Sequence, residues 1–170
     1  MRPPIVAADY RVQPGQAVTL INISANKGAA LFWQLVSHFP DREFIAVRGS
    51  YGNQIVPPKG DRPRNVTVLD NTPNIQEVYA RTRVLLMPSA RETFGRVALE
   101  AAASGIPTLA NPTVGLREAL GRAGIFACAI GSRNGYWRCA HWMTPRSMPN
   151  TPPRHYSGWR NMAARWIVNY

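Results

Sequence analysis

Two glutamates with seven residues between them, Glu92 and Glu100, are the side chains that point most directly to chemistry. Glu92 lies in the segment 88–95 that follows a strongly apolar run, and Gly95 is expected to open a helix that carries Glu100. The free backbone amides at such a helix start favour an anion. A carboxylate accepts hydrogen bonds from two neighbouring hydroxyl groups. A phosphate between two hydroxyl-bearing groups describes a nucleotide sugar.

Ordinary structural roles explain the same two carboxylates and stay open. Glu100 could pair with Arg96 one helical turn earlier, an interaction worth only about 0.3–0.5 kcal/mol on an exposed face. Glu92 could be favoured near the helix start by its charge alone.

A second feature is the pair Lys27-Gly28, in the turn after the first expected strand and at the mouth of a helix. A lysine beside a flexible glycine, with helix amides behind it, suits a phosphate group. A solvated lysine at an ordinary helix entry explains the pair equally well.

Up to residue 127 the chain alternates short β-branched or apolar runs with helical apolar spacing. We expect strands at 18–23, 43–47, 66–69, 84–87 and 107–110, helices at 29–38, 74–81, 95–104 and 116–121, and a loop at 49–64. This alternation predicts an α/β fold with a doubly wound parallel sheet, which binds ligands beyond the carboxyl ends of its strands.

Composition divides the chain of 170 residues into unequal parts. The formal net charge is +11, and residues 128–170 hold six arginines, no lysine, no acidic residue, both cysteines and four of the five tryptophans. We therefore expect a linker-like segment at 1–17, one Rossmann-like domain at 18–127 and an irregular basic tail at 128–170, in which only 159–170 could form a helix.

Three interpretations of the tail stay open. It could be an irregular extension, a basic aromatic arm for nucleic acid or anionic lipid, or a stretch translated in a shifted reading frame.

Several functions find no support in the sequence. Cys128 and Cys139 form neither a disulfide framework nor a zinc ligand set, and Ser89 lacks the context of a hydrolase nucleophile. No run of about 18 apolar residues is present, and the N-terminus does not resemble a secretory signal. We expect a cytoplasmic protein, with contact to the inner face of the membrane left open.

The order of motifs resembles the C-terminal domain of retaining glycosyltransferases of family 4, which have the two-domain GT-B fold. The resemblance rests on Pro88-Ser89-x-x-Glu92-x-Phe94-Gly95, Glu100-Ala101, Gly105-Ile106-Pro107, Lys27-Gly28 and Gly115-x-x-Glu118, and it covers residues 3–127. It implies transfer of a sugar from a nucleoside-diphosphate sugar to a glycan or lipid acceptor, with no metal and no other cofactor.

The resemblance also implies roles for single residues. Glu92 and Lys27 would be the catalytic pair, with Glu92 on the sugar hydroxyls and Lys27 on the diphosphate. Glu100 would bind the ribose. The donor site would further include Gly28, Thr93, Phe94, Gly95 and Arg96, with Asn74 and Ile75 beside the base.

This sequence departs from the family pattern in places. Ile21-Asn22-Ile23 stands where the family has an arginine, so one diphosphate contact is either missing or made by another residue, with Arg91 and Arg96 as the candidates. We expect the acceptor-binding domain to be supplied by another domain or subunit. Two alternatives remain, a basic module that binds nucleic acid or membrane through its tail, and an inactive truncated remnant.

Overall fold

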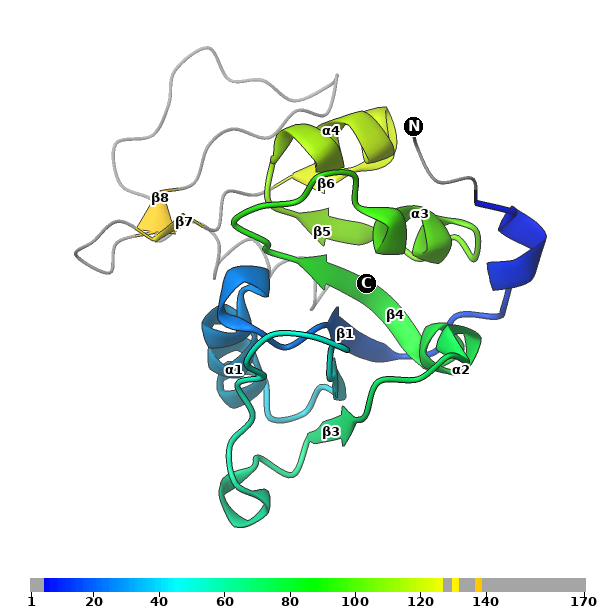
Figure 1. Cartoon of the computed structure of the whole chain (residues 1–170). Coiled ribbons are helices and arrows are strands. Elements are labelled where there is room, and N and C mark those ends of the chain that lie inside the picture. Colours follow the sequence, from blue (N-terminus) through cyan, green and yellow to red (C-terminus); the bar gives the residue numbers. More distant parts are fainter. Residues whose placement is uncertain (1–4, 127–129, 132–136, 139–170) are drawn as a thin grey trace.

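A six-stranded parallel sheet forms the centre of the molecule, in the order β3-β2-β1-β4-β5-β6 (Figure 1). The computed structural model describes residues 5–126, 130–131 and 137–138. The strands are β1 (Ala17–Ile21), β2 (Phe44–Val47), β3 (Val66–Leu69), β4 (Thr82–Met87), β5 (Thr108–Ala110) and β6 (Ile125–Phe126). This arrangement confirms the predicted doubly wound α/β fold.

The central strands are apolar because both faces of the sheet are covered. Every residue of β2 is buried, as are all residues of β4 except Arg83. β1 pairs in parallel with β2 on one side and with β4 on the other, in the register Thr19 opposite Ile45 and Leu85. Continuous apolar runs are typical of such strands.

The helices divide between the two faces. α1 (Ala29–His38) packs on one face, where Phe32 and Leu35 meet Leu20, Phe44 and Leu86. α2 (Ile75–Tyr79), α3 (Arg96–Ala102) and α4 (Val114–Leu120) pack on the other face, where the core includes Leu85, Ile106 and Leu116. Figure 1 shows α1 and α3 on opposite sides of β4.

The helix ends follow from local chemistry. Gly95 and Gly105, which flank α3, both have the left-handed backbone that glycine accepts most easily. The Thr113 side chain accepts a hydrogen bond from the backbone N–H of Leu116 and caps α4.

β1 ends two residues earlier than predicted, at Ile21, because Asn22 has φ 65° and leaves the strand conformation. β4 begins two residues earlier than predicted, at Thr82, which forms a buried hydrogen bond with Thr19. The expected loop 49–64 includes one short 3-10 helix, η3 (Lys59–Asp61).

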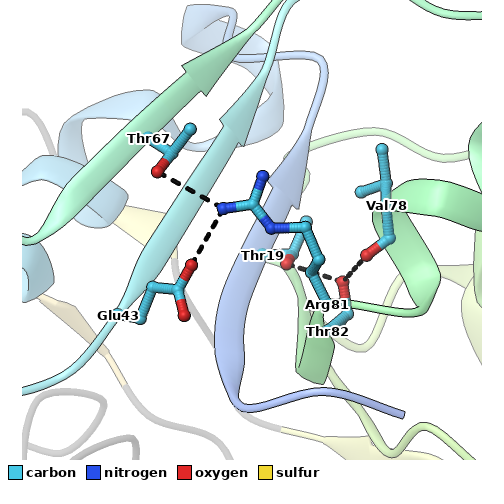
Figure 2. Close-up of polar contacts among 6 residues, drawn as sticks. All are labelled: Thr19, Glu43, Thr67, Val78, Arg81 and Thr82. Carbon is cyan, nitrogen blue, oxygen red and sulfur yellow. Dashed lines mark hydrogen bonds and ion pairs between the residues drawn. The ribbon is translucent and has the colours of Figure 1, made fainter. Parts of the chain in front are cut away.

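Polar contacts connect the amino ends of the strands (Figure 2). The Thr82 hydroxyl donates to the backbone oxygen of Val78 at 2.7 Å and lies 2.8 Å from the Thr19 hydroxyl. The Arg81 guanidinium pairs with Glu43 at 2.9 Å and lies 3.5 Å from the Thr67 hydroxyl. These amino ends lie opposite the carboxyl ends of the strands, where a ligand is expected.

The segment before β1 packs onto α2 and α3. It contains the 3-10 helix η1 (Ala7–Tyr10). The Ser104 hydroxyl donates to Tyr10 O at 2.7 Å and accepts from Val12 N at 2.9 Å, and Gln76 Nε2 donates to Asp9 O. The expected linker is therefore held against the domain from residue 9 onward.

Most of the expected tail lies outside the described residues, including the suggested helix at 159–170. Within it, β7 (Ile130–Gly131) and β8 (Trp137–Arg138) form a short antiparallel pair.

Candidate functional site

The carboxyl ends of β1 and β4 form the floor of a cavity of about 290 Å³. These strands are neighbours, yet β1 leads to β2 on one side and β4 leads to β5 on the other. Open parallel sheets bind ligands at such a switch point. The polar side chains that line the cavity are Asn22, Lys27, Ser50, Tyr51, Asn71, Ser89, Glu92 and Arg96.

Lys27 reaches the cavity from η2 (Ala25–Lys27), the short 3-10 helix between β1 and α1. The next residue, Gly28, has φ 89°, and a Cβ there would lie 2.4 Å from Cγ of Pro88. Ala90 N donates to Asn26 O at 2.9 Å. The loop after β1 is therefore fixed against the loop after β4. This contact fixes the position of the Lys27 backbone, from which the side chain reaches the cavity.

Lys27 and Glu92 form an ion pair at the edge of the cavity. Nζ of Lys27 lies 2.5 Å from Oε2 of Glu92, and the two side chains are only 21% and 14% exposed. Partial burial reduces screening by water and strengthens such a charge-assisted bond. The lysine and the first glutamate, predicted from separate motifs, thus lie together.

The loop 88–95 is held from the β5 side as well. Ser89 is buried, and its backbone oxygen accepts a hydrogen bond from Asn111 Nδ2 at 2.9 Å. A Cβ at Gly115 of α4 would lie 2.4 Å from the carbonyl group of Thr93. Glycine at position 115 therefore lets α4 approach the loop that carries Glu92. Thr93 itself is exposed and Phe94 is half-buried.

Glu100 is buried one turn behind Arg96, outside the residues that line the cavity, and both of its oxygens have partners. Oε1 accepts from Nε of Arg96 at 2.7 Å, and Oε2 accepts from the Tyr79 hydroxyl at 2.9 Å. The i,i+4 ion pair between Arg96 and Glu100, which their spacing in the sequence suggested, is therefore present. Burial, and then the charge of Glu100, raise the pKa of Tyr79, so its hydroxyl remains a donor at neutral pH.

Arg96 extends the contact to the segment before β1. Its side chain is 53% exposed, and Nη2 donates to the Tyr10 hydroxyl at 3.0 Å. The hydrogen bonds to Tyr10 and then to Glu100 raise the pKa of Arg96. Arg96 lines the cavity, whereas Arg91 is exposed outside its lining. Of the two arginines considered for a diphosphate contact, only Arg96 is positioned at the cavity.

The two residues expected beside a base, Asn74 and Ile75, lie at the start of α2. Asn74 Nδ2 is 3.3 Å from Oε1 of Glu77, and Ile75 packs against the apolar core. Asn71 lines the cavity in this region, and Asn74 and Ile75 do not.

A family model described as "Glycosyl transferases group 1" matches residues 18–136. The chain belongs to this family. The match begins at the second residue of β1 and includes the strands, helices and loops that form the cavity. A comparison with curated proteins found no match.

Solved structures support the same fold for this member of the group 1 family. A glycosyltransferase from Rickettsia africae is 14% identical, with a TM-score of 0.53, over 69% of this chain and 34% of its own. TarM is 17% identical, with a TM-score of 0.55, over 94% of this chain and 28% of its own. The sucrose-phosphate synthase from Thermosynechococcus elongatus is 20% identical, with a TM-score of 0.53, over 71% of this chain and 35% of its own.

The chain spans about a third of the length of each of these structures. Its sheet and helices correspond to the Rossmann-like half of a GT-B fold, as predicted.

The structure adds residues to the cavity that sequence reasoning missed. Asn22 has the left-handed conformation directly after β1, and Gln54 Nε2 donates to Asn22 Oδ1 at 3.1 Å. Gly49 N donates to Gln54 Oε1 at 2.8 Å, which holds the loop 49–51 beside Asn22. The one available signal was an asparagine at a strand end, because asparagine accepts positive φ more often than most residues.

Two kinds of feature are absent from the part of the chain that the structure describes. Within it, no group of three or more His, Cys, Asp or Glu side chains is arranged to hold a metal ion. None of its helices has the length and apolar character needed to cross a bilayer.

Proposed function

We propose that this chain binds the nucleotide-sugar donor of a retaining glycosyltransferase of family 4. The sugar would pass from a nucleoside diphosphate to a glycan or lipid acceptor. The observation that carries the proposal is the Lys27–Glu92 ion pair at 2.5 Å on the edge of the switch-point cavity. In this proposal Lys27 would be the cation for the phosphates, and the neighbouring Glu92 would be the carboxylate for the sugar hydroxyls.

The donor would lie across the carboxyl ends of β1 and β4. The Lys27 ammonium would contact the diphosphate, and Glu92, freed from Lys27 in part, would accept hydrogen bonds from the sugar. Gly28, Thr93, Phe94 and Gly95 would border the sugar and phosphates through their backbone. Glu100 would hold the ribose, and Arg96, which lines the cavity, would supply a further positive charge.

Lys27 would also serve the reaction itself. When the bond between the sugar and the diphosphate breaks, negative charge grows on the leaving phosphate. A fixed ammonium group stabilises that charge without reorganisation, as preorganised donors do in other active sites. In a retaining transfer the acceptor hydroxyl attacks from the face that the diphosphate leaves, so one cavity serves both events.

We infer that residues 18–127 form the donor-binding unit. An additional domain or subunit would form the acceptor-binding part. The chain spans about a third of the structures that it resembles. The segment 5–16 would lead to this second part and stays attached to α2 and α3 through Asp9, Tyr10 and Val12.

The test is calorimetric titration of the full chain with UDP, GDP and ADP. One of these should bind, and Lys27→Ala and Glu100→Ala should each weaken it by about 10-fold or more, because hydrogen bonds to charged groups are worth about 1.5–3 kcal/mol. Lys59→Ala in η3 and Glu43→Ala at the amino ends of the strands are matched controls that should bind like the wild type. Binding by the wild type that survives both Lys27→Ala and Glu100→Ala would overturn the site assignment.

A further inference from the structure

We propose that Tyr79 is the positioning residue of Glu100 and thereby sets a preference of the cavity for a ligand with two neighbouring hydroxyl groups. The inference rests on the proposed function, because it concerns how Glu100 would hold a ribose. It adds a residue from α2, a helix that contributes no side chain to the lining of the cavity.

Tyr79 is built into the core. The residue has no exposed surface, and its ring packs in the apolar cluster that contains Leu85 and Ile106. Only its hydroxyl meets polar atoms, Oε2 of Glu100 at 2.9 Å and the backbone oxygen of Val97 at 3.4 Å. A ring enclosed in this way cannot move its hydroxyl away from Glu100 without disturbing the core.

The hydroxyl is also a permanent donor. A tyrosine O–H has one proton to donate, and burial beside Glu100 raises the pKa of Tyr79, which keeps that proton in place. Oε2 of Glu100 is therefore held in one position at any physiological pH.

The other partner of Glu100 is of a different kind. Arg96 is 53% exposed and lies at the cavity, and its guanidinium already divides its hydrogen bonds between Glu100 and Tyr10. A long exposed side chain can exchange its partners at little cost. We therefore assign Arg96 as the partner that a ligand replaces and Tyr79 as the one that stays.

A fixed carboxylate has consequences for selectivity. Each carboxylate oxygen can accept two hydrogen bonds, so Oε2 retains one free position and Oε1 gains one when Arg96 moves. Two neighbouring hydroxyl groups can donate to both oxygens at once only if the plane of the carboxylate is aligned with the two O–H groups. Tyr79 fixes that plane before the ligand arrives, and preorganisation of this kind raises affinity.

The experiment compares ribose and deoxyribose ligands in matched variants. The full chain is titrated with UDP, GDP and ADP, and with the 2′,3′-dideoxy form of the one that binds. The readout is the ratio of the two dissociation constants. In the wild type we expect the dideoxy form to bind about 10- to 100-fold more weakly, the usual effect of losing hydrogen bonds to a charged group.

Tyr79→Phe should bring this ratio to about threefold or less, because one oxygen of Glu100 loses its fixed donor. A merely structural role would weaken both ligands equally and leave the ratio unchanged, and that result would overturn the inference while the proposed function stood. Failure of the wild type to bind any of the three nucleotides would overturn both.

Arg96→Leu provides a second test that leaves the core intact. The ratio of the two dissociation constants should stay at the wild-type value even if both ligands bind more weakly, since Tyr79 still donates to Oε2 of Glu100 when the Arg96 guanidinium is gone. Tyr10→Phe, which removes the other contact of Arg96, should behave in the same way. Collapse of the ratio in Arg96→Leu would overturn the assignment of Tyr79, whatever the folding of Tyr79→Phe.

Discussion

Lys27 and Glu92 are 65 residues apart in the sequence and are joined by an ion pair of 2.5 Å. The pair links the loop after β1 to the loop after β4 across the switch point of the sheet. Under the proposed function, a diphosphate would compete with Glu92 for Lys27, because both are anionic ligands of the same ammonium group.

Glu92→Gln should therefore bind a free nucleoside diphosphate at least as tightly as the wild type, because the competing charge is gone and the size of the side chain is kept. Lys27→Ala should bind it about 10-fold more weakly. Calorimetry with the nucleotide that binds the wild type measures both. A loss in Glu92→Gln as large as that in Lys27→Ala would mean that Glu92 acts by holding Lys27 in place.

The fold was predictable because local sequence patterns indicated its strands and helices. The apolar run at 84–87 indicated a buried central strand, and β4 lies between β1 and β5. The spacing of Leu31, Phe32 and Leu35 indicated the buried face of α1, which the structure confirms. The helix predicted at 95–104 is α3, and Gly105 beyond its end has a left-handed backbone, which glycine accepts most easily.

The contacts of the candidate site were only partly predictable. The i,i+4 spacing of Arg96 and Glu100 suggested their ion pair. Tyr10 and Arg96 are 86 residues apart, and Tyr79 and Glu100 are 21 apart with a strand between them. No periodicity relates such residues, since their contact depends on how α2, α3 and the segment before β1 pack together.

Gly28→Ala should destabilise the chain more than Gly52→Ala. Both glycines have positive φ, 89° and 79°, so an alanine at either position costs about 1–2 kcal/mol through its backbone. A Cβ at Gly28 would also lie 2.4 Å from the Pro88 ring, whereas a Cβ at Gly52 meets no atom within 4 Å. Urea unfolding of the two variants measures the difference. Equal losses would mean that the loops after β1 and β4 can separate freely.

Gly115→Ala should lower stability even though alanine favours a helix by about 1 kcal/mol over glycine. The added methyl group would meet the Thr93 carbonyl at 2.4 Å and push the loop that carries Glu92. Nucleotide affinity should fall together with the melting temperature. Val114→Ala is the control, because Val114 is the preceding residue of α4 and is 83% exposed. A more stable Gly115→Ala chain would show that the loop accommodates the methyl group.

Thr82→Val should cost more stability than Thr19→Val. The single hydroxyl proton of Thr82 goes to the Val78 oxygen, so Thr19 must donate to Thr82 (Figure 2). Thr82→Val leaves the buried Thr19 hydroxyl without an acceptor, at a cost of about 1–3 kcal/mol. The double variant should lose less than the sum of the single losses, and urea unfolding measures all three. Strict additivity would contradict the shared hydrogen bond.

Tyr79 should make the chain sensitive to alkaline pH. Burial, and then the charge of Glu100, raise the pKa of Tyr79 above its ordinary value of 10.0. Above about pH 10 the unfolded chain releases this proton and the folded chain keeps it, so stability falls with rising pH by at most about 1.4 kcal/mol per unit.

Tyr79→Phe lacks this proton. The unfolding free energy of the wild type minus that of Tyr79→Phe should therefore be constant between pH 7 and 9 and should decrease from pH 10 to 11. Urea unfolding at fixed pH values gives the difference, in which the titration of all other groups largely cancels. A difference that stays constant through pH 11 would mean that the folded chain releases the Tyr79 proton as readily as the unfolded one, which the buried hydrogen bond to Glu100 forbids.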